Sequence, residues 1–574
     1  MPNPTNTETD SVFNIHTHVF TKDHVPKYLA KKFIVWPFYM VLGIDFVIQI
    51  ISWFRRKRKF TYTARNKRWT LYQLRMFFVR NPLFNFFYTL FKWATSFIFA
   101  YYFLIWIRPL LDTTTLGRWI YPLMDTYLDF MPLVEPGWNQ FLLLLLLAIL
   151  FGHLRNSVTK LAKGRLKRLV GKQRLELLLR YLKIIDFSKN GKMGYIYKNL
   201  KQQYPPGSKF VVLPMDMEFM AAGQVAEPYL VQMDELMKLK SNNKESLHPF
   251  VFVDPRRIET QDPNTPFFDY DGSNPEKIEL NPCKLKEYLE GGACGIKIYP
   301  ALGYYPFDKN LLSLWLFCAQ NDIPITTHCS VGPIFYRGKK KKAWDRHPVF
   351  EEVISGSLDK GTAVLERLRL IQVHNKDFQA NFTHPLNYCC LLMPHFLKQL
   401  LDDYADERLN KLFGYANGSL ERNLKTLKIN LAHYGGAEHW DTFLERERYH
   451  TTNEVVFGPA VALNLQNELK QPGNFYQHWH YSDWFSLISS MLIEFDNVYS
   501  DISYTSHDNQ YLNLLSEIMN HRKINERVLF GTDFYVVSNH KTEKAFWIDM
   551  RNQLAPEKWQ KLAQENPNRF VGAS

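Results

Sequence analysis

The sequence contains few cysteines and lacks the motifs of several common enzyme classes. None of its six cysteines forms a CxxC pair, so we expect neither a disulfide framework nor a cysteine zinc finger. No glycine-rich phosphate loop and no serine-nucleophile elbow stands out, which argues against kinase and serine-hydrolase chemistry. The first ten residues, MPNPTNTETD, have neither the basic nor the apolar segment of a cleavable secretory signal, and we expect the catalytic part on the cytoplasmic side.

Acidic residues are scarce in the first part of the chain. Residues 1–208 contain 31 Lys and Arg against 10 Asp and Glu, whereas the remaining residues contain 39 against 46. A basic segment of this kind can bind nucleic acid. Here, however, the basic runs flank long apolar stretches, which favours the anionic inner surface of a membrane as a partner and argues against nucleic acid.

Three apolar stretches are candidates for membrane association, at residues 33–54, 84–107 and 138–154. The second is long enough to cross a bilayer, which requires about 20 residues, and the third is intensely apolar but short. Basic residues border the first on both sides, as in a re-entrant or interfacial helix. Residues 55–80 contain ten Lys and Arg and no acid, while the loop 108–137 is slightly acidic, so the positive-inside rule predicts a two-crossing hairpin. The alternative is a set of core helices in a large soluble protein.

Eight short β-branched runs that end in polar residues are spread over the rest of the chain. Helical stretches separate them, a pattern typical of βα units with a parallel sheet. Eight such units predict an α/β fold, a (β/α)₈ TIM barrel whose site lies at the C-terminal strand ends. The predicted organisation is a first barrel strand at 1–20, a helical, membrane-associated insertion at 21–207 between strands 1 and 2, and the rest of the barrel at 208–574. The predicted strands lie at 13–20, 210–216, 248–256, 294–300, 323–329, 429–436, 497–503 and 527–533.

Histidine and aspartate stand at the ends of several predicted strands. His16 and His18 are two residues apart, so both side chains point to the same face of a strand. His328 ends ITTH, His433 ends NLAH, and Asp533 lies in FGTD. A single strand histidine is usually an ordinary core residue, but five such residues on four strands predict one site. Neutral imidazoles with a carboxylate suit zinc or a similar divalent ion.

These motifs together resemble the amidohydrolase superfamily, especially its amidohydrolase-2 branch of TIM-barrel metal-dependent hydrolases. The resemblance is carried by HTH at 16–18, GIKIYPALGYYPFD at 295–308, THC at 327–329, LAHYGG at 431–436, LFGTDF at 529–534 and NPNRFVG at 566–572. It implies His16, His18 and Asp533 as ligands of one metal. It implies His328 and His433 as ligands of a second metal, or as a ligand and a catalytic group. Lys297 falls where binuclear members carry a carbamylated bridging lysine; the alternative is an unmodified lysine that binds an anionic substrate group.

The resulting expectation is a membrane-associated metal-dependent hydrolase with one or two divalent ions, zinc first, with manganese and iron as alternatives. Metal-activated water would attack an amide, ester or lactone bond of a small-molecule or lipid-like substrate. Asp533 would carry the proton, and His328 or His433 would stabilise the oxyanion. Two alternatives remain open: a metal-dependent decarboxylase or other lyase of the same superfamily, and a non-catalytic membrane scaffold. We also leave open whether the chain forms a homodimer.

Several other residues near strand ends are candidates for contacts with a substrate. The run 337–342, RGKKKK, follows the fifth strand and suits an acidic substrate or lipid headgroup, although such a run is usually a solvated loop. His384, in FTHP, is a further candidate for a contact with the substrate; the alternative is an ordinary turn residue. The remaining candidates are Asp216, Arg256, Arg257, Tyr304 and Tyr305.

Overall fold

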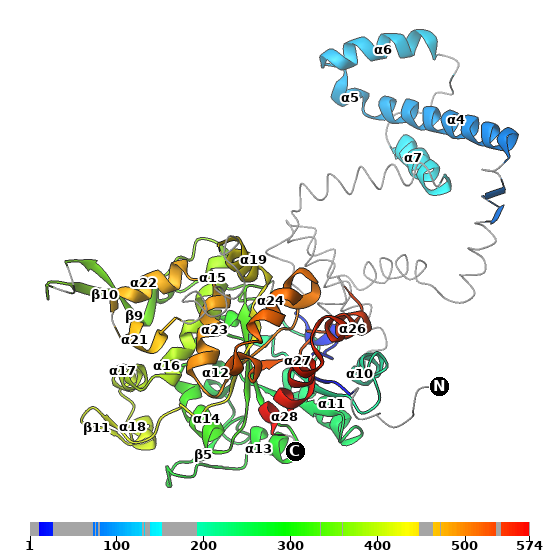
Figure 1. Cartoon of the computed structure of the whole chain (residues 1–574). Helices are drawn as coiled ribbons and strands as arrows, with labels where there is room; N and C mark the ends of the chain where they lie inside the picture. The colour runs from blue at the N-terminus through cyan, green and yellow to red at the C-terminus, as the bar shows by residue number, and fades with distance from the viewer. Residues whose placement is uncertain are drawn as a thin grey trace. The chain divides into compact units, whose positions relative to one another are not determined.

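The computed structural model divides the chain into two compact units (Figure 1). One comprises Met1–Ile48 and Leu177–Ser574 and is called the barrel unit below; the other comprises Gln49–Glu176 and is called the helical unit. This helical unit is shorter than the predicted insertion at 21–207. The structure describes residues 11–26, 73–74, 76–77, 81–128, 131, 138–151, 192–332, 334–356, 358, 360–446, 463–470, 472–534 and 541–572.

Eight strand segments form the centre of the barrel unit, and each falls within a predicted strand or overlaps it. Neighbouring strands pair in parallel around the barrel. The strands are β1 (Phe13–Thr17), β2 (Lys209–Val212), the continuous pair β3 (Leu247–Pro249) and β4 (Val251–Phe252), β7 (Ile296–Ile298), β8 (Ile325–Ser330), β13 (Ile429–Gly435), β14 (Val498–Asp501) and β15 (Val528–Leu529).

Backbone hydrogen bonds close these strands into a ring. Phe250 lies between β3 and β4, and its N–H donates to the carbonyl of Val212 in β2 at 3.0 Å, a typical length for such a bond. β3 and β4 therefore form one continuous strand beside β2. Between β1 and the end of β15, Ile15 N–H donates to the carbonyl of Phe530 at 2.9 Å. The predicted (β/α)₈ barrel is therefore confirmed.

Helices follow the strands and surround them, as Figure 1 shows. Side-chain caps fix where several begin: Asp308 accepts a hydrogen bond from Asn310 N–H, and Thr542 accepts one from Ala545 N–H. The helices are α11 (Tyr229–Ser241), α12 (Pro255–Glu259), α13 (Lys284–Glu290), α14 (Lys309–Gln320), α15 (Asn375–Thr383), α19 (Ala437–Arg446), α23 (Trp484–Glu494), α24 (Gln510–Ile518), α26 (Glu543–Gln553), α27 (Pro556–Gln560) and α28 (Asn566–Val571), with α10 (Met193–Lys201) before β2.

A small apolar cluster separates the two ends of the barrel. It is distinct from the large core between strands and helices, and its members come from five neighbouring strands and from α28. These side chains contact one another across the strands and do not belong to the outer core, so they lie on the inner face of the sheet. They fill the barrel interior, as expected for this fold. The members are Phe13, Ile15, Val211, Leu213, Phe250, Tyr499, Leu529, Phe570 and Val571.

The connection from β8 to β13 carries most of the additional structure of the barrel unit. Its antiparallel hairpin projects from the barrel, and α22 (Pro472–Tyr481) packs against one of the hairpin strands. The elements are β9 (Arg346–Ser355), β10 (Val364–Arg369), α16 (Cys389–Leu392), α17 (Pro394–Tyr404), α18 (Glu407–Phe413), β11 (Tyr415–Ala416) and β12 (Ser419–Leu420); elsewhere lie β5 (Tyr270–Asp271), β6 (Glu279–Leu280), α21 (Leu465–Glu468) and α25 (Arg522–Asn525).

The described part of the helical unit consists of α4 (Pro82–Trp106), α5 (Arg108–Leu111), α6 (Thr115–Tyr127) and α7 (Trp138–Leu150). Among the residues that the structure describes, no helix combines the length and apolar character needed to cross a membrane. The predicted crossings at 84–107 and 138–154 are therefore not supported. In α4, polar residues such as Asn85, Thr89 and Lys92 interrupt the phenylalanines, and α7 has only 13 residues. The stretch 33–54 lies outside the described residues.

Candidate metal centre

The predicted site residues meet at the C-terminal ends of the barrel strands. His16 lies in β1 and His18 follows it, His328 lies in β8, His433 lies in β13, and Asp533 follows β15. All five side chains are buried. They come from segments up to 517 positions apart, since His16 and Asp533 are brought together only by closure of the barrel.

Two of these residues have backbone conformations that non-glycine residues rarely adopt. His433 has φ = 71° and Asp533 has φ = 53°. Hydrogen bonds hold both in place: His433 N–H donates to an oxygen of Asp501 at 3.1 Å, and Asp533 N–H donates to the carbonyl of His16 at 2.9 Å. Strained backbone of this kind persists where surrounding contacts fix it, and it is common at functional sites.

His16, His18 and Asp533 form the first of two groups with the geometry of metal ligands. One ligand atom from each lies within 4.8 Å of the others. His18 Nδ1 lies 2.7 Å from the carbonyl oxygen of Leu213, which can only accept, so Nδ1 carries the proton and Nε2 keeps its lone pair in the neutral ring. That Nε2 lies 3.2 Å from Asp533 Oδ1. Two lone pairs at this distance repel each other unless a proton or a metal ion lies between them.

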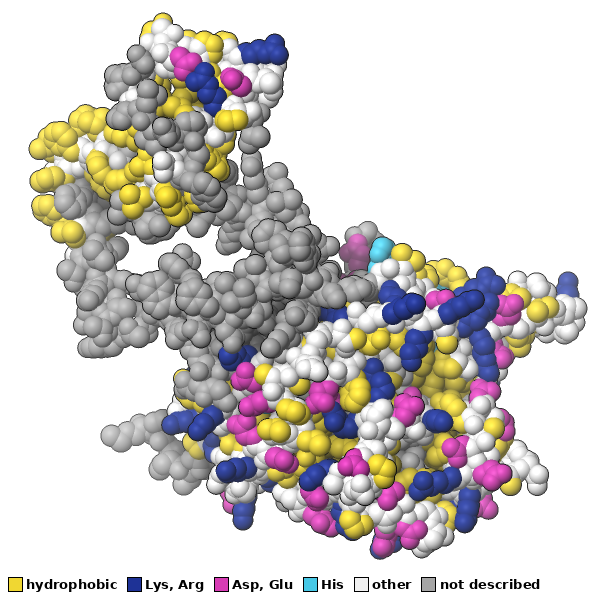
Figure 2. Space-filling view, turned by 180° about the vertical axis from the view of Figure 1, so that it is seen from behind, with side chains coloured by type: hydrophobic (Ala, Val, Ile, Leu, Met, Phe, Trp, Pro, Cys, Tyr) yellow, Lys and Arg dark blue, Asp and Glu magenta, His cyan; other side chains and the backbone are white. Residues whose placement is uncertain are grey.

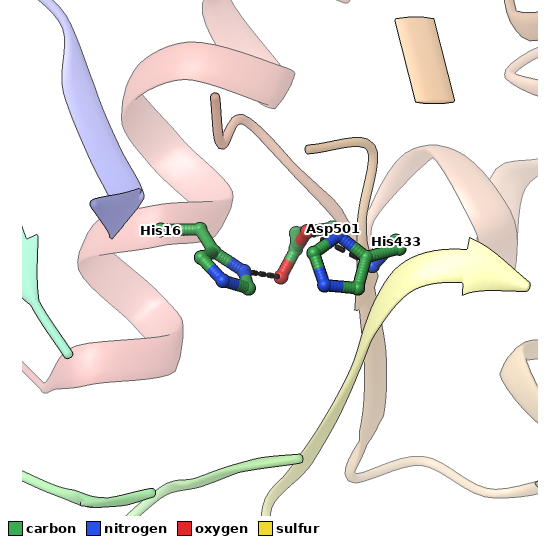
Figure 3. A group of neighbouring side chains, drawn as sticks. All are labelled: His16, His433 and Asp501. Carbon is green, nitrogen blue, oxygen red and sulfur yellow. Dashed lines mark hydrogen bonds and ion pairs between the residues drawn. The ribbon is translucent and has the colours of Figure 1, made fainter. Parts of the chain in front are cut away.

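Asp501 completes the second group, with His16 and His433, and was not singled out from the sequence. Figure 3 shows its carboxylate between the two imidazoles. Asp501 Oδ2 accepts from His16 Nδ1 at 3.0 Å and from Asn430 Nδ2 at 2.7 Å, and its other oxygen accepts from the Ser503 hydroxyl. Because Asp501 holds the Nδ1 proton of His16, His16 Nε2 keeps its lone pair for a ligand, as is usual for metal-binding histidines.

His433 and His328 form a hydrogen-bonded pair beside these groups. His433 Nδ1 lies 3.1 Å from the carbonyl of Ser503, so it carries the proton, and its Nε2 accepts from His328 Nδ1 at 3.0 Å. His328 Nε2 then accepts from the hydroxyl of Tyr299 at 3.1 Å, and the two rings stack at 4.1 Å. Burial lowers the pKa of both histidines, so both rings are neutral at pH 7.

Burial and neighbouring charges set the protonation of the remaining groups. Burial lowers the pKa of His16 to about 4 despite the opposing charge of Asp501. Burial acts to raise the pKa of both aspartates, but the histidines around them outweigh it and lower the pKa of Asp533 to about 2 and that of Asp501 well below its ordinary value. The centre therefore presents neutral imidazoles and ionised carboxylates, which are the protonation states that a divalent cation requires.

Lys297 lies on β7, buried, and faces the same carboxylates. Burial lowers the pKa of its ammonium to about 8, although the charges of Asp501 and Asp533 oppose the shift. A lysine with this pKa has an appreciable neutral fraction near pH 8, as carbamylation requires. The unmodified ammonium equally suits an anionic substrate group, so both predicted roles of Lys297 stay open.

The weaker candidates lie apart from the histidines or in supporting positions. Arg257 pairs with Asp216 at 2.7 Å, and Arg256 pairs with Asp254 at 2.6 Å. His384 stacks on Trp479 at 3.9 Å. Within the run 337–342, Arg337 is buried rather than solvated, while the lysines are exposed or half-buried. The remaining candidates, Tyr304 and Tyr305, are respectively buried and half-buried.

Fold and side chains together define a (β/α)₈ barrel with a candidate divalent-metal centre at its C-terminal end. No family model and no curated protein matches the sequence. Among solved structures, 5-carboxyvanillate decarboxylase from Novosphingobium aromaticivorans, solved with manganese, is 14% identical; the similarity covers 65% of this chain and 79% of that chain, with a TM-score of 0.31.

Two further solved structures are similar at the same level. For 2,6-dihydroxybenzoate decarboxylase from Rhizobium, the identity is 12%, the covered shares are 66% of this chain and 87% of that chain, and the TM-score is 0.33. For a zinc-bound amidohydrolase from Burkholderia multivorans, the identity is 9%, the covered shares are 65% and 86%, and the TM-score is 0.29. The function proposed below therefore depends on the barrel and on the geometry of its own side chains.

Proposed function

We propose that this chain is a metal-dependent hydrolase of the amidohydrolase type. A divalent ion, zinc first and manganese or iron as alternatives, would be held by His16, His18 and Asp533. The observation that carries the proposal is the convergence of His16, His18 and Asp533 in a buried place, where one ligand atom of each lies within 4.8 Å of the others. Their protons are held elsewhere by Asp501 and by the carbonyl of Leu213, so the donor set fits a cation.

A divalent ion supplies Lewis acidity, which polarises a carbonyl and acidifies water. Asp533, ionised and adjacent to His18, accepts the proton of the attacking water and returns it to the leaving amine or alkoxide. His328 Nδ1–H, which donates to His433 Nε2 in this structure, is the N–H that would turn to the developing oxyanion and stabilise it. The reaction is hydrolysis of an amide, ester or lactone, with an amphipathic small molecule as the proposed substrate.

A second candidate function is decarboxylation, and the position of Arg337 favours it. This guanidinium is buried in the loop after β8, where its backbone N–H donates to the carbonyl of Met220 at 2.8 Å. Burial lowers its pKa to about 9, opposed by Tyr299, whose ring stacks on His328. A substrate carboxylate would stabilise the buried charge next to the centre, as a lyase acting on a carboxylated substrate requires.

The test begins with the metal content of the purified full-length protein, beside a double variant His16→Ala/His18→Ala. One or two equivalents of zinc, manganese or iron, lost in the variant, is the expected result. No bound metal after reconstitution with each of these ions would contradict the proposal and favour the non-catalytic scaffold.

The loaded protein is then assayed with 4-nitrophenyl esters, N-acyl amides, lactones and hydroxybenzoates. Acid or amine product without CO₂ supports hydrolysis. CO₂ released from a hydroxybenzoate, with loss of release in Arg337→Gln, supports the lyase instead.

A further inference from the structure

The described helices of the helical unit share only a small apolar core. This core is built around Tyr101, Tyr102 and Tyr121, with Met124 and Leu144. The hydroxyl of Tyr121 donates to the carbonyl of Leu104 at 3.0 Å, and so uses a buried side chain to satisfy a helix backbone. Thr95 and Gln140 are buried there too. Nine further apolar residues pack against this core and are only partly buried, so the core covers little of the apolar surface of these helices.

The outside of the same unit is apolar. Figure 2 shows hydrophobic side chains over much of its described surface. Neighbouring residues of an α-helix point about 100° apart, yet exposed apolar residues follow one another along α4, so they cover more than one side of it. The exposed large apolar residues of α4 are Leu83, Phe84, Phe86, Phe87, Tyr88, Leu90, Phe91, Trp93, Phe97, Phe103 and Trp106.

The helices beside α4 repeat this arrangement. On α6, Leu116, Trp119, Leu123 and Tyr127 are exposed and recur every three or four residues, so they form one apolar stripe. On α7, Phe141, Leu142, Leu145 and Leu146 are exposed. A helix that is apolar on several sides requires an apolar environment rather than water.

Among the residues of this unit that the structure describes, charged side chains are few. Arg108, the first residue of α5, binds Asp125 in α6 through two hydrogen bonds of 2.9 and 2.8 Å. In the sequence, two strongly basic runs of this unit flank the described helices: ten Lys and Arg without an acid at 55–80, and eight without an acid at 153–174. Basic runs next to apolar segments in a sequence are typical of chains that bind anionic lipid headgroups.

We propose that the outer surface of α4, α6 and α7 is a lipid-binding surface, and that its partner is a bilayer rich in anionic lipid. A second copy of the chain would bury one matching face of each helix. The exposed apolar residues of α4 lie on more than one side, which a bilayer covers and a paired face does not. The lipid surface is independent of the metal centre and of the reaction at it.

The test is flotation of the full-length protein with vesicles after removal of detergent. Vesicles of phosphatidylcholine alone are compared with vesicles that contain phosphatidylserine. The test variant is Trp93→Glu/Trp119→Glu, whose side chains are 74% and 70% exposed. Tyr481→Glu on α22 is the control, because Tyr481 is also 74% exposed but lies on the barrel unit.

Wild type and the control should float with both kinds of vesicle, and more strongly with phosphatidylserine. The double variant should partition at least about tenfold less, because two charges enter an apolar contact. Its metal content should equal that of wild type, which separates this proposal from the proposed function. Equal flotation of all three proteins would overturn the proposal. So would a wild-type dimer that stays off vesicles and dissociates in the double variant, since the surface would then join two copies.

Discussion

Replacing Glu543 by Gln should stabilise the barrel unit above pH 7 and change little near pH 5. Glu543 opens α26 and is buried, and one of its oxygens accepts a hydrogen bond from the hydroxyl of Tyr204 at 2.7 Å. That hydroxyl accepts from Asn14 Nδ2 at 2.9 Å, so its own proton is directed at Glu543. Burial raises the pKa of Glu543 from 4.5 to about 7, against the hydrogen bond from Tyr204.

The magnitude follows from the raised pKa. In the unfolded chain the carboxyl ionises at its ordinary value, whereas in the folded protein it keeps its proton until about pH 7. The folded state therefore binds more protons between these values, and the free energy of unfolding falls as the pH rises through this range. A shift of 2.5 units at about 1.4 kcal/mol per unit corresponds to about 3 kcal/mol. Above pH 7 the wild-type protein has lost this contribution to its unfolding free energy. The Gln variant keeps it, because the neutral amide resembles the protonated acid.

The assay is thermal unfolding of wild type and Glu543→Gln between pH 5 and pH 8 in one buffer and detergent. For a unit of about 450 residues, about 3 kcal/mol corresponds to about 3 °C in melting temperature. The difference between variant and wild type should grow by about that amount towards pH 8. Glu557→Gln, at an exposed position on α27, is the control and should follow wild type. A variant that parallels wild type at every pH would refute the reasoning.

Three further predictions concern the candidate centre. Asp501→Asn should lower metal affinity about 10- to 100-fold, because the charge that orients His16 is lost; competition with a chelator measures this, and unchanged affinity would contradict the role given to Asp501. Asp533→Asn should abolish turnover and leave vesicle flotation intact, so an active variant would exclude Asp533 as the proton carrier. In Gly531→Ala, the new Cβ would lie 2.8 Å from the Cβ of His16 and 3.2 Å from that of Ser503. We expect a loss of about 1–3 kcal/mol in unfolding free energy together with lower metal content. If both equal the wild-type values, the neighbouring side chains can shift without destabilising the protein.

The barrel could be predicted from the sequence because its strands are short, apolar and parallel. Each run of β-branched residues lies between a helix and a polar turn, and this local pattern does not depend on how far apart two strands lie in the chain. The first strand was found despite the long segment before the second, since HTH marks it independently. The third strand was predicted to extend to residue 256. It ends at Phe252, because Asp254 caps α12 and Pro255 begins that helix.

The helical unit shows where composition misleads. Stretch 84–107 was interpreted as a crossing from its count of apolar residues, yet the helix there also contains asparagine, threonine, tyrosine and lysine. Whether such side chains lie inside or outside a helical unit depends on packing with α6 and α7. Tyr101 and Tyr102 lie in the core of the helical unit, whereas Trp93 is exposed, and no periodicity in the sequence predicts this arrangement.

The candidate site was predictable only as far as its residues stand on strand ends. His16, His18 and Asp533 follow that rule, because parallel strands end on the same side of a barrel. Asp501 also ends a strand and was included in the predicted run 497–503, but a single aspartate after a strand is common. Its significance depends on a contact with His16, 485 positions away, which only the closed barrel creates.

The hydrogen-bond acceptors, rather than the histidines alone, determine what the centre can bind. Asp501 takes the Nδ1 proton of His16, the carbonyl of Leu213 takes that of His18, and the carbonyl of Ser503 takes that of His433. Each acceptor fixes one nitrogen as a donor and leaves the opposite nitrogen with a lone pair. His16 and His18 also form, with the carboxylate of Asp533, a group whose ligand atoms lie within 4.8 Å of one another, and this donor set fits a cation. The lone pair of His433 Nε2 accepts from His328 Nδ1–H, so His433 can bind a cation through this nitrogen only after that hydrogen bond breaks.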